Sequence, residues 1–236
     1  MTANPRSSRT SAERRSAPKP SKASPVRPNA AGSKVVWLVV VAVVAVGGLF
    51  ALYTRSNQSG GSTSTSGSGK YAFQVGDPGP GQSAPPIHLT SATGSEFDLA
   101  GAHGKTVLLY FQEGVGCQPC FDQIKALEKD PTVLNGLGVD ELVSITGSGR
   151  DQIAQKVSDM GLSTPVLSDP DLAVSKTYHA NDYGMMGTGA DGHTFILVGP
   201  DGTIRWRADY GGKPNYTMFV PVDQLVADLS VGLNKS

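Results

Sequence analysis

The chain has 236 residues, a formal net charge of zero and two cysteines. This length fits one folded domain with flanking segments. Two cysteines only three positions apart cannot staple distant parts of a fold, which argues against a disulfide-stapled scaffold. The zero charge hides an asymmetry, because residues 1–34 hold eight Lys or Arg residues against the single Glu13, a balance of +7 that the remaining residues offset at −7.

The basic N-terminus has the composition of a disordered segment. Residues 1–34 are rich in Pro, Ser, Arg and Ala, a composition that does not support a packed core. Their positive charge suits the anionic headgroups of a membrane surface. No nucleic acid partner is expected, because an apolar run follows directly.

Residues 35–53 form an uncharged run dominated by Val, Leu, Ala and Gly. As a helix rising about 1.5 Å per residue, this run spans roughly 28 Å, close to the hydrocarbon thickness of a bilayer. Trp37 and Tyr53 lie near its ends, where interfacial aromatic side chains are common. A buried core helix would show a polar face, and a cleaved signal peptide would have a shorter apolar run and a small-residue cleavage site. We predict a transmembrane anchor in the lipid bilayer at residues 35–54.

The positive-inside rule places the basic segment in the cytoplasm and everything after the anchor outside. We therefore predict a single-pass cell membrane protein whose catalytic domain is extracytoplasmic, a location that permits disulfides. Residues 55–70 consist mainly of Ser, Gly and Thr, which predicts a flexible linker with a reach of roughly 20 Å. The folded domain is predicted at residues 71–236.

Hydrophobic patterning and turn residues predict the elements of this domain. Short strands at 87–90 and 96–99 form a β-hairpin, and the apolar run 106–111 is a buried central strand. A helix follows the cysteines and ends near residue 130. The later elements are a strand at 142–145, a helix around 153–160, a strand at 165–167, a helix capped by Asp169-Pro170 that runs to about Tyr178, strands at 193–198 and 203–208, and a closing helix around 222–229. This order predicts an α/β sandwich with a mixed central sheet flanked by helices.

The pair Cys117 and Cys120, separated by Gln118 and Pro119, is the most informative stretch. The spacing suits a disulfide that opens and closes in exchange chemistry. Half of a zinc site is one alternative, but it needs two further ligands and no second CxxC supplies them. Two incidental thiols are the other alternative.

The context of the pair supports redox chemistry. Apolar residues at helical spacing follow Cys120, and Pro119 falls in the first turn, where a helix tolerates proline. Cys117 is therefore predicted at a helix N-terminus, where unpaired N–H groups and the helix dipole stabilise a thiolate. Cys120 is predicted one turn inside. We assign Cys117 as the nucleophile and Cys120 as the resolving thiol.

From about Ala84 to Gly211 the chain resembles the redoxin branch of the thioredoxin fold. The resemblance rests on the order of the hairpin, the central strand, the CxPC helix, segment 167–178 and segment 194–202. This branch includes the alkyl hydroperoxide reductase/thiol-specific antioxidant proteins and the membrane-tethered TlpA-like thiol–disulfide oxidoreductases. The resemblance implies a thioredoxin-like sandwich, preceded here by the transmembrane helix, and a cysteine-based redox activity without a cofactor.

The chain departs from the family pattern in three places. Peroxiredoxins carry Thr or Ser three residues before the reactive cysteine and Pro seven before, positions that hold Gly114 and Tyr110 counting from Cys117. Their Arg before the Thr-Phe strand is also missing. Thioredoxin-like reductases carry Trp before the first cysteine, which is Gly116 here, and a cis-proline facing the pair, which aligns with Gly192. These departures weigh against a peroxidase and leave thiol–disulfide exchange as the leading prediction.

Two further residues are candidates for the site. Glu113, four positions before Cys117, is placed to shuttle protons to the resolving thiol if it is not an exposed loop residue. His193 begins the strand expected beside the cysteines, where it would tune Cys117 or complete a copper site with Cys117 and Cys120. Copper chaperones of the Sco type share this fold but space their cysteines differently.

Three functions therefore remain open: a thiol–disulfide oxidoreductase, a peroxiredoxin-like antioxidant and a Sco-like copper chaperone. The first predicts protein thiols or disulfides outside the membrane as substrates, with a membrane or extracytoplasmic redox partner. On the last strand pair, Arg205 and Arg207 are predicted on a shared, solvated face, and Trp206 is predicted in the core.

Overall fold

A computed structural model describes residues 41, 64–66 and 69–233. The chain divides into two units, residues 1–55 and 56–236. In the first unit only Val41 is described, and it lies in a helix. The predicted basic segment 1–34 and the rest of the predicted anchor 35–54 lie outside the described residues. Within the described residues, no helix has both the length and the apolar character to cross a membrane.

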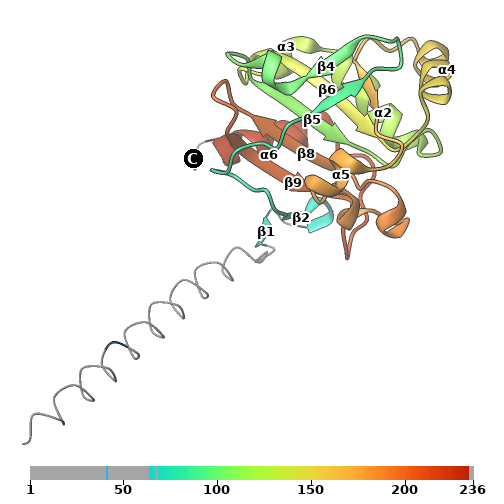
Figure 1. Cartoon of the computed structure of the whole chain (residues 1–236). Helices are drawn as coiled ribbons and strands as arrows, with labels where there is room; N and C mark the ends of the chain where they lie inside the picture. The colour runs from blue at the N-terminus through green and yellow to red at the C-terminus, as the bar shows by residue number, and fades with distance from the viewer. Residues whose placement is uncertain (1–40, 42–63, 67–68, 234–236) are drawn as a thin grey trace, which may run out of the picture. The chain divides into compact units, whose positions relative to one another are not determined.

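The folded unit is built on a seven-stranded mixed sheet in the order β1-β2-β9-β8-β5-β6-β7. Its central strand β5 pairs in parallel with β6 and antiparallel with β8, and Figure 1 shows these strands side by side in the core of the unit. This confirms the predicted mixed sheet. The strands are β1 (Ser64–Ser66), β2 (Phe73–Val75), β5 (Val107–Phe111), β6 (Glu141–Thr146), β7 (Val166–Ser168), β8 (Thr194–Val198) and β9 (Ile204–Asp209).

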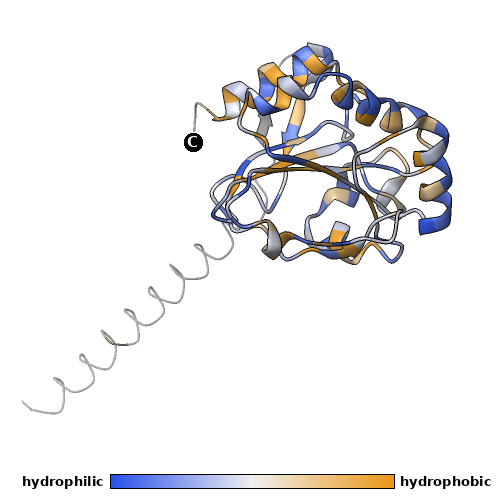
Figure 2. Cartoon of the chain, turned by 90° about the horizontal axis from the view of Figure 1, so that it is seen from above, coloured by the Kyte–Doolittle hydropathy of each residue, from blue (hydrophilic) through white to orange (hydrophobic). Residues whose placement is uncertain are grey.

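The two faces of the sheet bury different sets of apolar side chains. On one face, helices α2 (Gln118–Glu128), α4 (Arg150–Met160) and α6 (Val222–Leu233) pack their apolar residues against the sheet. In Figure 2 these helices show hydrophobic and hydrophilic residues in turn along their length, as amphipathic surface helices do. The other face is covered by the hairpin β3 (His88–Thr90) and β4 (Glu96–Asp98), by η2 (Leu99–Ala102) and by the residues around α5 (Ala173–Thr177).

The predicted order of elements is confirmed, and the short elements are the ones that the sequence pattern missed. These are the strands β1 and β2, the helix α3 (Pro131–Asn135), and the 3-10 turns η1 (Gly69–Tyr71), η2, η3 (Ala180–Tyr183) and η4 (Gly187–Gly189). Helix α5 begins at Ala173, a few residues after the predicted cap at Asp169-Pro170. Asp169 nevertheless binds the start of that helix, because its carboxylate accepts from the N–H groups of Val174 and Ser175.

The predicted linker 55–70 is not structureless throughout. Ser64–Ser66 forms strand β1, which pairs antiparallel with β2, and β2 in turn pairs with β9 through Gln74 and Asp209. Ser and Thr have no apolar pattern that would reveal a strand, so here the pairing of the backbone with a neighbouring strand decides the structure.

The prediction of a solvated Arg207 is wrong. Its side chain is fully buried and forms an ion pair with Asp209 at 2.8 Å, while Arg205 on the same strand is partly exposed and pairs with Asp201. Strand β9 lies between β8 and β2, inside the sheet. Trp206 is buried as predicted and packs edge-on against Phe73.

Candidate active site

The cysteines follow the carboxyl end of the central strand through a tight loop of residues 112–116. Gly114 has a φ of +113°, and a Cβ there would lie 2.3 Å from the hydroxyl oxygen of Ser148. The same hydroxyl accepts from the N–H of Val115 at 3.0 Å, and the Gly114 N–H donates to the Gln112 side chain at 2.7 Å. Only glycine fits this turn, and the loop is held against the end of β6.

Cys117 and Cys120 form a disulfide with an S–S distance of 2.02 Å. Cys117 is the N-cap of α2, and its Sγ accepts the backbone N–H of Cys120 at 3.2 Å. Pro119 lies in the first turn of the helix and is exposed. Cys117 is 9% exposed and Cys120 is completely buried. The assignment of Cys117 as the nucleophile stays a prediction, and this difference in exposure is the one it requires.

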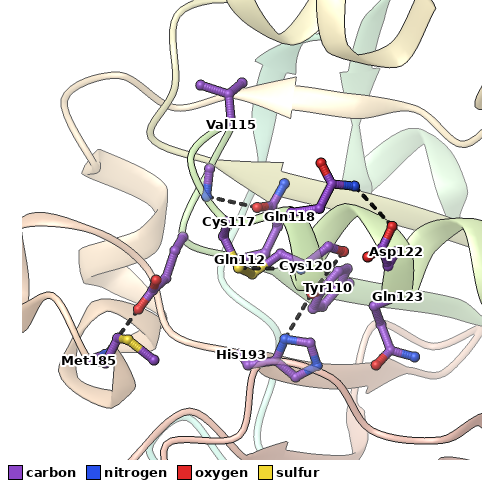
Figure 3. The surroundings of a disulfide bond; sticks show 12 residues. Tyr110, Gln112, Val115, Cys117, Gln118, Cys120, Asp122, Gln123, Met185 and His193 are labelled. Atoms are coloured by element: carbon purple, nitrogen blue, oxygen red, sulfur yellow. Dashed lines mark hydrogen bonds between the residues drawn. A yellow bond between two sulfur atoms is a disulfide. The ribbon is translucent and has the colours of Figure 1, made fainter. Parts of the chain in front are cut away.

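A buried tyrosine–histidine pair lies beneath the disulfide (Figure 3). The Tyr110 hydroxyl hydrogen bonds to Nδ1 of His193 at 2.8 Å and donates to the carbonyl oxygen of Cys120 at 3.2 Å. Both side chains are fully buried, and Phe195 stacks on Tyr110. Burial lowers the pKa of His193 to about 3. Burial, and secondarily the charge of Glu113, raises the pKa of Tyr110 well above its ordinary value.

The predicted copper site is not assembled. Nδ1 of His193 is bonded to Tyr110, and both cysteine sulfurs are in the disulfide. Among the described residues, no three His, Cys, Asp or Glu side chains come together in a group that could hold a metal ion. The sequence placed His193 beside the cysteines but gave no sign that Tyr110 would bind its ring.

Glu113 contacts a different part of the site from the one predicted. Its carboxylate accepts the backbone N–H of Met185 at 3.0 Å, which ties the cysteine loop to the segment between η3 and η4. Its charge still acts on Tyr110. No contact between Glu113 and Cys120 accompanies these interactions, so its role as a proton shuttle stays a prediction.

The model of the AhpC/TSA family matches residues 80–207, which is more than half of the chain. The chain belongs to the AhpC/TSA family. This is a family of thioredoxin-fold redox proteins, so the chain is an oxidoreductase by family, in agreement with its vicinal cysteine pair. No curated protein matches the chain.

Solved structures show that the AhpC/TSA fold is shared at low sequence identity. Peroxidoxin BcpB from Mycobacterium tuberculosis is 16% identical, with a TM-score of 0.53 over 65% of this chain and 97% of that one. Reduced 2-Cys peroxiredoxin from Plasmodium vivax is 20% identical, with a TM-score of 0.54 over 66% and 97%. Peroxiredoxin Q from Xanthomonas campestris is 15% identical, with a TM-score of 0.50 over 61% and 90%. At sequence identities this low, the likeness shows a shared fold and nothing more.

This AhpC/TSA member cannot hold a proline at Gly192, where the resemblance to thioredoxin-like reductases expects one. The Gly192 N–H donates to the carbonyl oxygen of Ala180 at 2.9 Å, a bond that proline lacks the hydrogen to make. In addition, a Cβ at Gly192 would lie 2.1 Å from the carbonyl oxygen of Tyr183. The close approach of segment 180–183 therefore explains the glycine.

Four residues around the cysteines were not predicted from the sequence as part of the site. Gln112 and Gln123 are fully buried amides, and the Gln123 side-chain oxygen accepts the N–H of Val220 at 2.7 Å. Met218 forms a buried apolar cluster with the two cysteines, and Tyr110 lies below them. One signal of these residues was present in the sequence. Gln123 is a polar residue on the apolar face of α2, and a buried polar side chain is expected to have a hydrogen-bond partner.

Proposed function

We propose that the chain is an extracytoplasmic, membrane-tethered thiol–disulfide oxidoreductase that uses Cys117 and Cys120. The supporting observation is the disulfide at the N-terminus of α2, in which Cys117 is 9% exposed and Cys120 is completely buried. A surface sulfur can meet a protein substrate, whereas a buried one can react only with its neighbour. The tether and the location rest on the sequence of residues 1–54.

The exchange follows from these two positions. As a reductant, the Cys117 thiolate attacks a substrate disulfide, forms a mixed disulfide and releases the first substrate sulfur as a thiolate. Cys120 then attacks Cys117 Sγ, which closes the internal disulfide and releases the second substrate thiolate. The substrate gains two electrons and, from water, two protons. Run in reverse, the same steps oxidise a substrate dithiol, and the reduction potential decides the direction.

The free N–H groups at the start of α2 stabilise the Cys117 thiolate. Met218 belongs to the same buried cluster as the two cysteines, and its neighbour Phe219 is an exposed large apolar residue, as are Met185 and Met186. Exposed large apolar side chains commonly mark an interaction surface. This supports protein thiols or disulfides outside the membrane as substrates.

Two serine variants test the proposal. In Cys120→Ser the mixed disulfide with an unfolded disulfide protein such as insulin should accumulate, because the resolving thiol is gone. In Cys117→Ser no mixed disulfide should form, and insulin reduction should stop. Full activity in Cys117→Ser would overturn the proposal.

Hydroperoxide reduction is the second candidate, and family membership is the observation that favours it. Against it, the positions three and seven residues before Cys117 hold Gly114 and Tyr110, and neither carries the side chain that peroxiredoxins use there. Stopped-flow mixing of the reduced protein with hydrogen peroxide decides between the two. A rate no faster than that of an ordinary thiol removes the peroxidase.

A further inference from the structure

Two buried aspartates share one serine hydroxyl at helix α5. Oγ of Ser175 lies 2.7 Å from Oδ2 of Asp169 and 3.0 Å from Oδ2 of Asp191. Asp169 follows β7, and Asp191 precedes β8. All three residues are buried, with Asp169 at 1% exposure and the other two at zero. Buried polar groups of this kind need hydrogen-bond partners, so the protons within the cluster have to account for its contacts.

The cluster is one proton short if both aspartates are ionised. A serine hydroxyl has a single proton to donate. Asp169 already accepts the N–H groups of Val174 and Ser175, at 3.3 Å and 2.8 Å, and it has the shorter contact with the hydroxyl. The hydroxyl therefore donates to Asp169. The 3.0 Å contact between Ser175 and Asp191 is then a hydrogen bond only if Asp191 supplies the proton.

The second carboxyl oxygen of Asp191 also fits a neutral acid. Oδ1 is buried and has no hydrogen-bond partner among the described residues. Burying a carboxylate with an unpartnered oxygen costs far more than burying the neutral acid in the same place. Burial raises the pKa of Asp191 to about 8, in the direction that the proton count requires.

We propose that Asp191 is protonated in the native fold and acts as a pH-sensitive latch for residues 180–191. In the closed form, the Asp191 carboxyl group donates to Ser175. At alkaline pH the proton passes to solvent, the bond is lost, and a second buried negative charge appears beside Asp169. The segment 180–191 is then released. This inference goes beyond the proposed thiol–disulfide exchange and does not depend on it.

The segment 180–191 connects the latch to the loop that precedes the cysteines. The backbone N–H of Met185 donates to the Glu113 carboxylate of that loop at 3.0 Å. The backbone at Gly184 approaches Asp191 closely, because a Cβ at Gly184 would lie 2.9 Å from the Asp191 carbonyl oxygen. A movement of Asp191 therefore displaces the same stretch of backbone that contacts the cysteine loop.

Asp169 is the charged group that acts on Asp191. Burial is the main cause of the raised pKa of Asp191, and the negative charge of Asp169 adds to it. The other charged or titratable side chains on the adjoining elements are Lys176 on α5, the exposed pair His179 and Asp182 at η3, Glu113, His193 on β8, and the buried pair Arg207 and Asp209 on β9. His193 is neutral, because burial lowers its pKa to about 3. Loss of the Asp191 proton therefore leaves two negative charges around one hydroxyl, and their repulsion opens the latch.

Hydrogen exchange of the full-length chain, read by mass spectrometry, measures the release directly. Peptides covering residues 180–192 report on the segment. Peptides covering helix α4, which packs on the other face of the sheet, are the internal reference. Relative to this reference, protection of the segment should be constant from about pH 6 to about pH 7.5 and should fall about tenfold per pH unit above about pH 8.

Asp191→Asn is the decisive variant, since its amide can donate to Ser175 as the protonated acid does but cannot ionise. Its segment should keep constant protection over the whole pH range, and its urea midpoint at about pH 6 should match the wild type. Asp169→Asn is the matched control, because three donors point at that carboxylate, and its urea midpoint should fall. Equal losses of midpoint in the two variants, or the same pH-dependent loss of protection in Asp191→Asn as in the wild type, would overturn the latch.

An infrared measurement on the unmodified protein covers variants that fail to fold. A protonated carboxyl group has a C=O stretching band that is separate from the bands of carboxylates, and labelling the aspartate side chains with ¹³C identifies it. The band should be present at about pH 6 and disappear as the pH rises past about 8. Its absence at about pH 6 would show that Asp191 is ionised and would overturn the proposal. None of these measurements uses thiol–disulfide exchange, so failure to reduce insulin would count against the proposed function alone.

Discussion

Two buried polar clusters lie on neighbouring strands of the same sheet and differ in how completely their hydrogen bonds are made. Around Arg207, the guanidinium binds Asp209 and the carbonyl oxygens of Pro78 and Tyr178. Asp209 also accepts the N–H of Gly76 and the hydroxyl of Thr194. Beneath the disulfide, by contrast, one nitrogen each of Gln112, Gln123 and His193 lacks a partner among the described residues.

This difference separates a structural cluster from a functional one. A buried charge pair with all its hydrogen bonds made joins distant segments, here β2, α5 and β9, and has nothing left to react with. Buried groups with unused donors or acceptors cost folding energy. Proteins keep such destabilising groups mainly at sites that need them for chemistry. In this chain, the unpaired nitrogens of Gln112, Gln123 and His193 lie at the cysteine site.

The largest expected effect on stability is at the Arg207–Asp209 cluster. Arg207→Met leaves the Asp209 carboxylate buried without its cation, and we expect a loss of about 3–5 kcal/mol in the free energy of unfolding. Urea denaturation followed by circular dichroism measures it. Arg205→Ala, which removes an exposed pair with Asp201, should change stability by about 0.5 kcal/mol or less. Equal losses in the two variants would contradict the structural role of the buried pair.

The second-largest effect is expected in the loop of residues 112–116, which leads into Cys117. Gly114→Ala puts a Cβ into the Ser148 hydroxyl at a φ of +113°, so we expect a loss of about 1–3 kcal/mol and slower attack by Cys117. Gly116→Ala is the matched control, because a Cβ there meets nothing within 4 Å. Rates of thiolate release from a chromogenic aromatic disulfide and denaturation curves test both. A Gly114→Ala protein with wild-type kinetics would show that the loop need not keep this shape.

The third prediction concerns the pH dependence of stability, where two buried groups act in opposite directions. Burial raises the pKa of Asp191 to about 8, so the unfolded chain releases this proton at lower pH than the fold, and stability falls as the pH rises toward 8. The low pKa of His193 acts the other way, because the unfolded chain gains a proton below its usual pKa of 6.5. The two slopes oppose one another from about pH 4 to pH 6.5.

Of the two groups, only Asp191 still acts above about pH 6.5, so wild-type stability should fall by about 1 kcal/mol per pH unit as the pH rises toward 8. Asp191→Asn should remove this fall. Urea denaturation at several pH values across the range tests it. An unchanged slope in the variant would assign the pH dependence to another group.

The smallest effect is expected at Glu113. Glu113→Gln keeps an oxygen for the Met185 N–H and removes the charge near Tyr110. Because the Glu113 carboxylate is bonded to the Met185 N–H, closure of the disulfide by Cys120 should change by no more than about threefold, as judged by the release of the second thiolate from a chromogenic aromatic disulfide. A loss of about a hundredfold would instead make Glu113 the proton shuttle that its position in the sequence suggests.

The sequence by itself determined the local elements and the reactive pair. The apolar run 106–111 specified the central strand, and helical spacing with Pro119 in the first turn specified α2, because these signals depend only on neighbouring residues. The same local reasoning placed Cys117 at the helix start. The anchor at 35–54 remains a prediction from hydropathy.

Tertiary structure alone decided the contacts between distant segments. β9 became an inner strand through pairing with β2, a strand of three residues that is too short to show as a pattern in the sequence, and Arg207 on β9 is buried. The pairing of β5 with β8 brought Tyr110 next to His193, and segment 180–183 left room only for glycine at 192. Hydrophobic periodicity shows which face of an element is buried but not which element covers it. The polar contacts that tune the cysteines therefore appear only once the sheet is assembled.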